Sequence, residues 1–351
     1  MIYENEKLSK YNWFNLGGPD RLESVKPFLF NLFNDKAIIS LPRVFRFMLA
    51  YLISSKREKT AKEIYSFIGG SSPILKNTKD QAKKITGFLM NEKESFSVHV
   101  CMRYWHPMAK EVVKKVINTK PDEILLVPLY PQYSTTTTGS SFLAWDKEFK
   151  KYNKNIVTKR ICCYPSQDYF IAAHLEKLKK IFDIIMKKEK TLRNTTVLFS
   201  AHGLPEKIIK GGDPYQYQIE LTVKQILSKT TEVGFNFSIC YQSKVGPLKW
   251  LEPSTEQAVI NAAKNKRTIV IIPIAFVSEH SETLVELDIE YSKLAKDHGC
   301  KNYYRISALG ISNAYIKSLV SLILGASNRK GLINRKICPN SLDRCYQKGM
   351  D

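Results

Sequence analysis

One segment of the sequence concentrates side chains that could handle a metal ion. VSEHSETLVELDIEY (277–291) carries Glu282, Glu286 and Glu290 at intervals of four residues. On a helix this spacing places the three carboxylates on one face, where like charges cost about 0.2–0.5 kcal/mol per pair. A solvated helix face tolerates that cost, so the acidic row alone does not identify a site.

A histidine elsewhere in the chain makes the acidic row a stronger candidate for a metal site. His202 follows the aliphatic run 195–201 and precedes Gly203, so it is expected at the end of a strand with backbone room beside it. A histidine that is hydrogen-bonded within a loop is the ordinary alternative. Beside the acidic row, however, an imidazole completes a set of ligands for a divalent cation that is bound and then released. We expect the helix of the acidic segment to begin at Ser278, as its N-cap.

The elements that position these residues follow from the hydrophobic pattern. Continuous aliphatic and β-branched runs alternate with helical segments, which is typical of parallel strands in a doubly wound α/β fold. The expected strands are 97–104, 123–130, 156–163, 195–201, 235–241, 268–277 and 302–306.

The two halves of the chain resemble each other. VPLYPQYS (127–134) and IPIAFVSEH (272–280) both lead from an aliphatic strand through a proline into a polar turn. We therefore expect two Rossmann-like domains with parallel sheets and a cleft between them, since ligands in such folds sit at the carboxyl ends of strands. The expected boundaries are 1–165, 166–325 and a peripheral tail at 326–351.

Composition narrows the class of protein. With 44% hydrophobic and 25% charged residues, the chain is a folded globular protein, and its longest apolar runs are too short to cross a bilayer. The polar N-terminal residues and an odd count of seven cysteines favour a reducing, cytoplasmic location. The net charge of +21 is spread along the chain without a basic arm, so we expect no nucleic-acid partner. Signatures of nucleotide hydrolases, dinucleotide enzymes and zincin proteases are missing.

Several long motifs resemble those of one family. LYPQYSTTTTGSSF, LFSAHGLP, GDPY, YQSKVGPLKWLEP and PIAFVSEHSETLVELDIEY, with FNLGGPD, IGGSSP and MRYWHP, resemble the motifs of bacterial ferrochelatases in order and spacing. The match spans residues 14–320. The resemblance implies a type II chelatase-like fold and the insertion of Fe²⁺ into protoporphyrin IX, which forms protoheme in heme biosynthesis.

The resemblance also implies roles for individual residues. His202 would be the metal ligand or the base that removes pyrrole protons, with Glu282 as its partner, and Glu286 and Glu290 would form an acidic relay. Histidine suits this task because its pKa lies near neutrality. The residues implied to bind the porphyrin are Arg103, Tyr104, Tyr65, Ser72, Arg57, Ser243 and Trp250.

No resident cofactor is expected, because Fe²⁺ is a substrate. Some family members carry a [2Fe–2S] cluster on four cysteines, and here Cys338, Cys345 and either Cys162 or Cys163 could supply three ligands. Gln347 and Thr135 stand where relatives have cysteine. Because four thiolates are the rule, we favour the absence of a cluster over its presence.

The stretch 28–57 is rich in aromatic and basic residues. Two core helices would explain part of it. The resemblance implies that it is the lip of the active site and rests on a membrane, and such a surface suits an anionic interface. We therefore expect peripheral contact with the inner face of the membrane.

Three other functions compete with this interpretation. Insertion of Fe²⁺ into coproporphyrin III and insertion of Co²⁺ into a related tetrapyrrole are close relatives of the expected reaction. A catalytically idle heme- or porphyrin-binding module is the alternative from another class. That module would have lost His202 or Glu282, and both are present.

Overall fold

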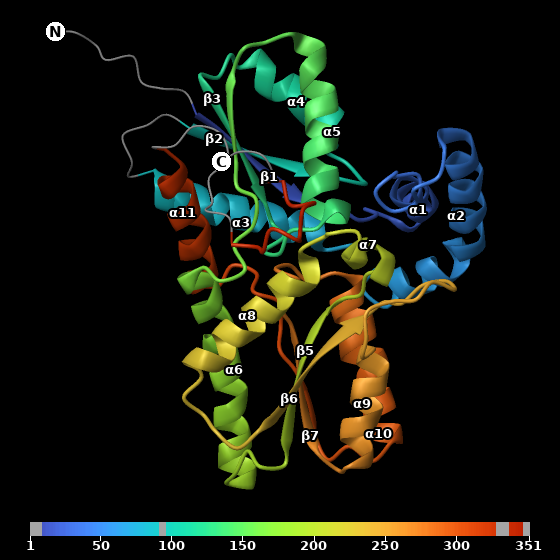
Figure 1. Ribbon diagram of the computed structural model, residues 1–351, viewed down its shortest axis with the longest axis vertical. Coiled ribbons are helices and arrows are strands. Elements are labelled where there is room, and N and C mark those ends of the chain that lie inside the picture. Colours follow the sequence, from blue (N-terminus) through green and yellow to red (C-terminus); the bar gives the residue numbers. More distant parts are fainter. Residues whose placement is uncertain (1–8, 91–95, 328–336, 347–351) are drawn as a thin grey trace, which may run out of the picture. The chain divides into compact units, whose positions relative to one another are not determined.

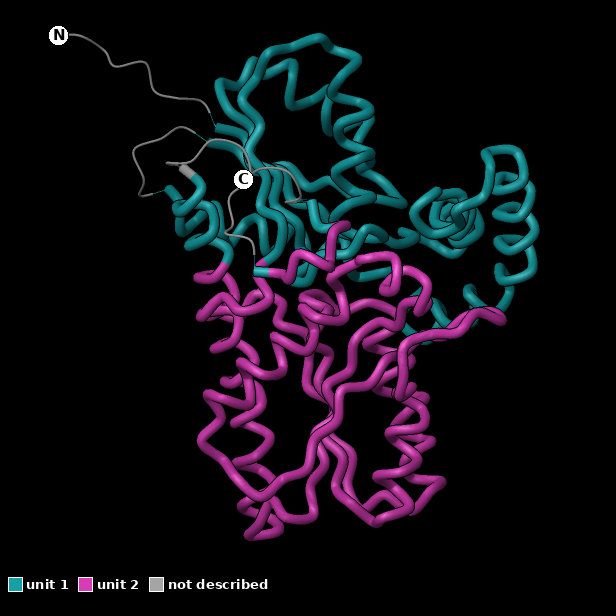
Figure 2. Tube along the Cα trace, viewed as in Figure 1, with its two compact units in different colours: residues 1–163, 319–337, 345–351 teal, residues 164–318, 338–344 magenta. Residues whose placement is uncertain are grey.

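The chain folds into two compact units. The computed structural model describes residues 9–90, 96–327 and 337–346. Unit 1 comprises residues 1–163, 319–337 and 345–351, and unit 2 comprises residues 164–318 and 338–344 (Figure 2). Each unit contains one four-stranded parallel sheet flanked by helices, which confirms the predicted α/β class (Figure 1). Within the described residues, no helix has the length and apolar character needed to cross a membrane.

Unit 1 is built on a sheet of strand order β2-β1-β3-β4. The strands are β1 (Ser9–Asn15), β2 (Phe96–Met102), β3 (Glu123–Pro128) and β4 (Val157–Arg160). The helices are α1 (Val25–Phe33), α2 (Arg43–Ser66), α3 (Ile74–Leu89), α4 (Ala109–Asn118) and α5 (Ser140–Phe149). Helix α11 (Asn313–Ser327) begins in unit 2 and continues in unit 1.

Unit 2 repeats this plan with strand order β6-β5-β7-β8. The strands are β5 (Thr195–His202), β6 (Asn236–Gln242), β7 (Thr268–Pro273) and β8 (Tyr303–Arg305). The helices are α6 (Asp168–Glu189), α7 (Glu206–Lys210), α8 (Tyr215–Lys229), α9 (Thr255–Lys264) and α10 (Tyr291–Asp297). Helices α6 and α8 lie on one side of the sheet, with α9 and α10 on the other (Figure 1).

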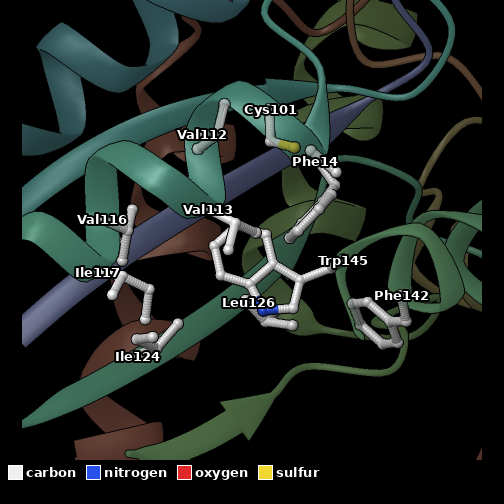
Figure 3. Packing of buried hydrophobic residues seen from close by; sticks show 11 residues of the cluster. Phe14, Cys101, Val112, Val113, Val116, Ile117, Ile124, Leu126, Phe142 and Trp145 are labelled. Carbon is white, nitrogen blue, oxygen red and sulfur yellow. The ribbon is translucent and has the colours of Figure 1, made fainter. Parts of the chain in front are cut away.

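The core of unit 1 shows why these runs become buried strands. Aliphatic residues of α4 and the aromatic rings of α5 pack against side chains of β1, β2 and β3 (Figure 3). The ring of Phe14 meets the ring of Trp145 edge-on at a centroid distance of 5.7 Å. Such edge-to-face pairs add to the free energy gained by burial alone.

Strand β1 was not among the predicted strands. Its segment SKYNWFN lacks an aliphatic run, yet all seven residues are buried and pair in parallel with both β2 and β3. A central strand has its backbone donors and acceptors satisfied on both sides, so tertiary pairing overrides weak local propensity. The polar side chain of Asn15 finds a partner in the hydroxyl of Thr78, 3.0 Å away.

The two sheets match in register. In unit 1, Phe14 pairs with Cys101 on one side and Pro128 on the other. In unit 2, Ser200 pairs with Cys240 and Pro273 in the same way. The predicted similarity of the halves therefore holds for strand order and for register.

A π-helix follows the proline-ended strand in each unit. Residues Thr135–Gly139 follow β3, and residues Glu282–Glu290 follow β7. The prediction that the second helix starts at Ser278 was wrong, because its N-cap is Ser281, whose side chain makes no capping hydrogen bond. The polar residues before it are held by tertiary contacts instead. π-helical turns are rare and are often found at functional sites.

Glu279 anchors the loop that leads into the second π-helix. Its carboxylate accepts hydrogen bonds from the Arg305 guanidinium at 2.9 and 3.1 Å and from the backbone N–H of Ala308 at 2.9 Å. Burial alone would raise the pKa of Glu279, but the charge of Arg305 and these hydrogen bonds outweigh it and lower the pKa. The loop after β7 is thus fixed to strand β8 by an ion pair.

This pair predicts a pH-dependent loss of stability. Glu279→Gln should lower the free energy of unfolding at pH 7 by about 1–3 kcal/mol, because a charged hydrogen-bonded acceptor is lost. The wild-type carboxylate contributes above its unfolded pKa and loses that contribution as pH falls through its lower folded pKa. Denaturant titrations should therefore show that the difference in free energy of unfolding between wild type and Glu279→Gln shrinks as pH falls below about 4.3. Asp80→Asn, which breaks an exposed pair with Lys76, is the control, and an equal loss there would contradict the assignment.

Candidate active site

His202 presents one ring nitrogen at the carboxyl end of β5. Its Nδ1 lies 2.6 Å from the carbonyl oxygen of Gly203, and a carbonyl only accepts, so Nδ1 carries the hydrogen. In the neutral ring Nε2 then keeps its lone pair. Metal-binding histidines commonly donate their other N–H in this manner. The hydroxyl of Tyr215, from the GDPY motif, donates to the backbone carbonyl of His202 at 3.1 Å and holds the strand end.

Glu282 lies between two imidazoles. Its Oε1 is 3.7 Å from Nε2 of His202, and its Oε2 is 3.6 Å from Nε2 of His280. The predicted partnership of His202 and Glu282 therefore has a geometric basis in unit 2. The two nitrogens and the carboxylate form a short series of groups that can each hold a proton.

His280 was singled out only as a member of the acidic segment. It is buried, and its Nδ1 faces the carbonyl oxygen of Ser278 at 3.1 Å. Burial alone would lower the pKa of His280, yet the hydrogen bond and charge of Glu282 raise it above the ordinary value. The sequence SEHSE gave a signal for it, since His280 is two residues from Glu282.

Glu286 is held by four hydrogen bonds, so it does not belong to a freely solvated helix face. It accepts from Nε2 of Gln242 at 3.1 Å and from the hydroxyl of Tyr291 at 2.8 Å. Ser243 contributes both its backbone N–H at 2.9 Å and its hydroxyl at 2.6 Å. Gln242 also donates to the carbonyl of Glu282 at 3.3 Å, which links the strand end to two turns of the π-helix.

The backbone of Ser243 is in an unusual conformation. Its φ is +63°, in the left-handed region that side-chain-bearing residues rarely occupy. This conformation accompanies the two donors that Ser243 directs at Glu286. Backbone strain of this kind is typical of functional sites and is maintained by the surrounding contacts.

Glu290 ends the acidic row and is exposed. Burial of part of its carboxyl and the nearby charge of Glu286 raise the pKa of Glu290. The three carboxylates of the row therefore differ in their surroundings: Glu282 lies between two imidazoles, Glu286 is hydrogen-bonded and Glu290 is exposed.

Aromatic rings flank His202. Trp250 has its ring centroid 6.4 Å from that of His202, and Phe276 lies at the same distance on another side. The indole N–H of Trp250 donates to the carbonyl of Val245 at 3.1 Å. Gly203 allows this packing, because a Cβ there would lie 2.9 Å from the carbonyl oxygen of Gln242 and 3.1 Å from the indole.

In unit 1, Arg103 and Tyr104 form a second polar cluster with residues the sequence did not suggest. Arg103 donates through Nη2 to Asp35 at 2.7 Å and through Nε to Ser140 at 2.6 Å. The hydroxyl of Tyr104 donates to the same Asp35 oxygen at 2.8 Å, and the hydroxyl of Ser140 donates to it as well. Asp35 and Ser140 lie far from Arg103 in sequence, so no local pattern could have grouped them.

The other predicted porphyrin-binding residues of unit 1 have different neighbours. Tyr65 is buried and packs in the same hydrophobic cluster as Tyr104. Ser72 lies against Gly18, where a Cβ would come within 2.5 Å of it. The guanidinium of Arg57 lies 5.9 Å from the ring centroid of Phe33.

The cysteines considered as cluster ligands lie in two places within the described residues. Cys162 and Cys345 lie 3.9 Å apart between sulfur atoms, with Cys163 in the same buried apolar cluster of unit 1. Cys338 is counted with unit 2 and accepts a hydrogen bond from Gln218. In residues 9–90, 96–327 and 337–346, no three His, Cys, Asp or Glu side chains are placed to hold a metal ion. Gln347 lies outside these residues.

The hydrogen bonds of Glu286 predict that it differs from Glu290 in stability tests. Glu286→Gln should lower the free energy of unfolding by about 1–3 kcal/mol, since the amide cannot accept at both positions. Glu290→Gln should cost nothing, because it relieves repulsion from Glu286. Denaturant titrations of both variants at pH 7 check this prediction. An unchanged free energy of unfolding in Glu286→Gln would indicate that Glu286 belongs to a solvated helix face.

Comparison with known proteins identifies the family of the chain. The family model named Ferrochelatase matches residues 13–326. A protein named ferrochelatase from Pelagibacter ubique is 50% identical over 339 residues, covering 95% of this chain and 96% of its own. A ferrochelatase from Rickettsia bellii is 46% identical over 351 residues, covering 97% and 95%.

Solved structures support the fold. SirB from Bacillus subtilis with Fe³⁺ superposes with a TM-score of 0.53 at 10% sequence identity, covering 92% of this chain and 96% of its own. At that identity the likeness concerns the fold alone. The family match and the relatives, by contrast, extend over nearly the whole sequence, including the segments that carry His202 and Glu282. The chain belongs to the ferrochelatase family.

Proposed function

We propose that this chain is a ferrochelatase that inserts Fe²⁺ into protoporphyrin IX and forms protoheme. The observation that carries the proposal is the pair of His202 and Glu282, in which Nε2 of the histidine faces a carboxylate oxygen 3.7 Å away. Family membership supplies the reaction class. Fe²⁺ is a substrate of this reaction, and no step is assigned to a resident cofactor.

The reaction requires a route for two protons. Porphyrin loses its two pyrrole N–H protons as Fe²⁺ takes their place on the nitrogens. His202 accepts a proton at Nε2, because its Nδ1 is committed to the carbonyl of Gly203. Glu282 stabilises the resulting imidazolium and passes protons on, with His280 on its other oxygen. Glu286 and Glu290 continue the row outward.

The same carboxylates suit the incoming cation. Fe²⁺ is attracted by an acidic row but is not trapped, because hard oxygen ligands in an open arrangement exchange readily. Glu286, whose oxygens are occupied by four hydrogen bonds, guides the ion mainly by charge. Glu290 is the exposed end at which the ion first arrives.

Porphyrin contacts are proposed for residues of each unit taken by itself. The Arg103 guanidinium and the Trp250 ring beside His202 are assigned to contact the macrocycle. Tyr104 is fully buried, with Arg103 over its ring, so it supports Arg103 without touching the porphyrin itself. Aromatic walls can hold a puckered ring, which exposes a nitrogen lone pair and favours the transition state over the flat substrate. The propionates are assigned to Tyr65, Ser72 and Arg57, since hydroxyl and guanidinium donors suit carboxylates. The implied role of Ser243 in porphyrin binding is indirect, because its hydroxyl and backbone N–H both donate to Glu286.

The first activity test concerns His202 and Glu282. His202→Ala should reduce anaerobic Fe²⁺ insertion at least a hundredfold, the scale of general-base catalysis, and Glu282→Gln should be the most impaired of the three glutamate variants. The fold should survive, as shown by an unchanged thermal midpoint for His202→Ala.

A matched histidine serves as control. His298→Ala, at the end of α10, also removes an imidazole bonded to a backbone carbonyl and should retain full activity. Assays with coproporphyrin III and with Co²⁺ distinguish the related chelatases. Wild-type protein that binds porphyrin but metalates none would be an idle module.

We also infer that α2 contacts a membrane surface. Its first half exposes large apolar side chains, each 54–68% accessible, namely Val44, Phe45, Phe47, Met48, Tyr51 and Leu52. Only its other face packs inward, through Ala50 and Ser54, so the stretch 28–57 is not simply a pair of core helices. Basic residues Arg43, Lys56 and Lys59 lie on the same helix. An exposed apolar helix with basic residues suits the interface of an anionic bilayer, and we assign it to the inner face of the cytoplasmic membrane.

Vesicle binding checks this surface. Wild-type protein should co-sediment with anionic lipid vesicles, less so as salt rises. The double variant Val44→Glu/Met48→Glu should bind at least tenfold more weakly, because burying each side chain contributes about 1.5–3 kcal/mol. Val233→Glu/Met90→Glu alters the same residue types at sites 82% and 73% exposed and should bind normally. An equal loss of vesicle binding in both double variants would contradict the contact between α2 and the membrane.

A further inference from the structure

Asp35 is the one carboxylate in the polar cluster of unit 1. Its Oδ2 receives hydrogen bonds from Nη2 of Arg103, from the hydroxyl of Tyr104 and from the hydroxyl of Ser140. Its Oδ1 accepts the backbone N–H of Ala37 at 2.9 Å. One carboxylate oxygen thus fixes three side chains, and the other ties Asp35 to its own loop.

These groups come from separate parts of the fold. Asp35 lies in the connection between α1 and α2, and Arg103 and Tyr104 directly follow β2. Ser140 is the first residue of α5, immediately after the π-helix Thr135–Gly139. The cluster is therefore closed by a residue of the loop that leads to the exposed helix α2.

The matched registers relate this cluster to the active site of unit 2. Cys101 and Cys240 occupy equivalent positions on β2 and β6, so Arg103 corresponds to Gln242, two residues further on. Gln242 donates to Glu286 on the π-helix after β7, and Arg103 donates to Ser140 at the end of the π-helix after β3. The cluster lies at the carboxyl end of strand β2 in its own sheet.

Asp35 is charged and largely enclosed. The side chains of Asp35 and Arg103 are 9% and 18% exposed. Burial would raise the pKa of Asp35, but the Arg103 guanidinium and the hydroxyl donors lower it. A free arginine side chain samples many rotamers, whereas this guanidinium is held at both Nε and Nη2 and stacks on the ring of Tyr104 at 4.7 Å.

We propose that Asp35 is a positioning residue that orients the Arg103 guanidinium for the porphyrin, with the buried Tyr104 held beneath it by the same carboxylate oxygen. The proposal rests on the function proposed above, because that function gives Arg103 its task. Asp35 does not touch the substrate. It sets the direction of the guanidinium and balances its charge, so that binding does not require the arginine to be ordered anew.

A double-mutant cycle tests whether Asp35 acts through Arg103. Asp35→Asn keeps the shape of the side chain but cannot accept all the donors at Oδ2. It should lower kcat/KM for protoporphyrin about tenfold, mainly by raising KM, and should weaken porphyrin binding measured by fluorescence quenching. In an Arg103→Ala background the same change should alter either quantity less than twofold, because its effect passes through the missing guanidinium.

Two further variants keep the test decisive. Asp20→Asn removes a carboxylate of the same unit that accepts from Ser24 and Trp105, and it should leave kcat/KM unchanged in both backgrounds. Should Asp35→Asn fail to fold, Ser140→Ala removes one donor of the cluster without leaving a charge unpaired, and it should show the same dependence on Arg103.

The outcomes separate the two proposals. Wild-type kcat/KM in Asp35→Asn, or an equal loss with and without Arg103, overturns the positioning role while the ferrochelatase activity stands. Wild-type protein without Fe²⁺ insertion overturns the proposed function itself. The binding arm of the cycle then still decides whether Asp35 orients Arg103.

Discussion

The carboxylate of Glu286 can remain between a strand end and a helix only because donors surround it. Leaving such a group without partners would cost several kcal/mol, and Gln242, Ser243 and Tyr291 meet that demand. The network continues inward, since Gln242 accepts from the hydroxyl of Ser200, which in turn contacts Thr255. Strands β5 and β6, the π-helix and α9 are therefore held in one arrangement, and His202 and Glu282 take their places within it.

Unit 1 uses the same scaffold with the charges reversed. Where unit 2 ends its sheet in an acidic row beside an imidazole, unit 1 ends its sheet in an arginine, and a carboxylate from outside the repeat balances it. A buried charge needs a partner with good geometry. The connection between α1 and α2 supplies that partner, so a residue outside the sheet completes the cluster.

Much of this arrangement was predictable from sequence. Continuous aliphatic runs predicted the strands, and strand-end placement grouped His202 with Glu282. Strand β1 was not predicted, because its pairing on both edges compensates for polar residues such as Lys10 and Asn12. The π-helix Glu282–Glu290 was not predicted either, since the spacing of its glutamates by four residues suits an α-helix equally well. Asp35 could not be found, because its partners are 68 and 105 residues away and no local period links them.

The left-handed backbone of Ser243 has a consequence for adaptation to temperature. Glycine would adopt this conformation with less strain, and relief of such strain is worth about 1–3 kcal/mol. A lineage selected for heat resistance would be drawn to that replacement. It would also lose the hydroxyl that donates to Glu286, and the backbone N–H alone would remain. At position 243, thermostability thus favours glycine, whereas the ordering of the acidic row favours serine.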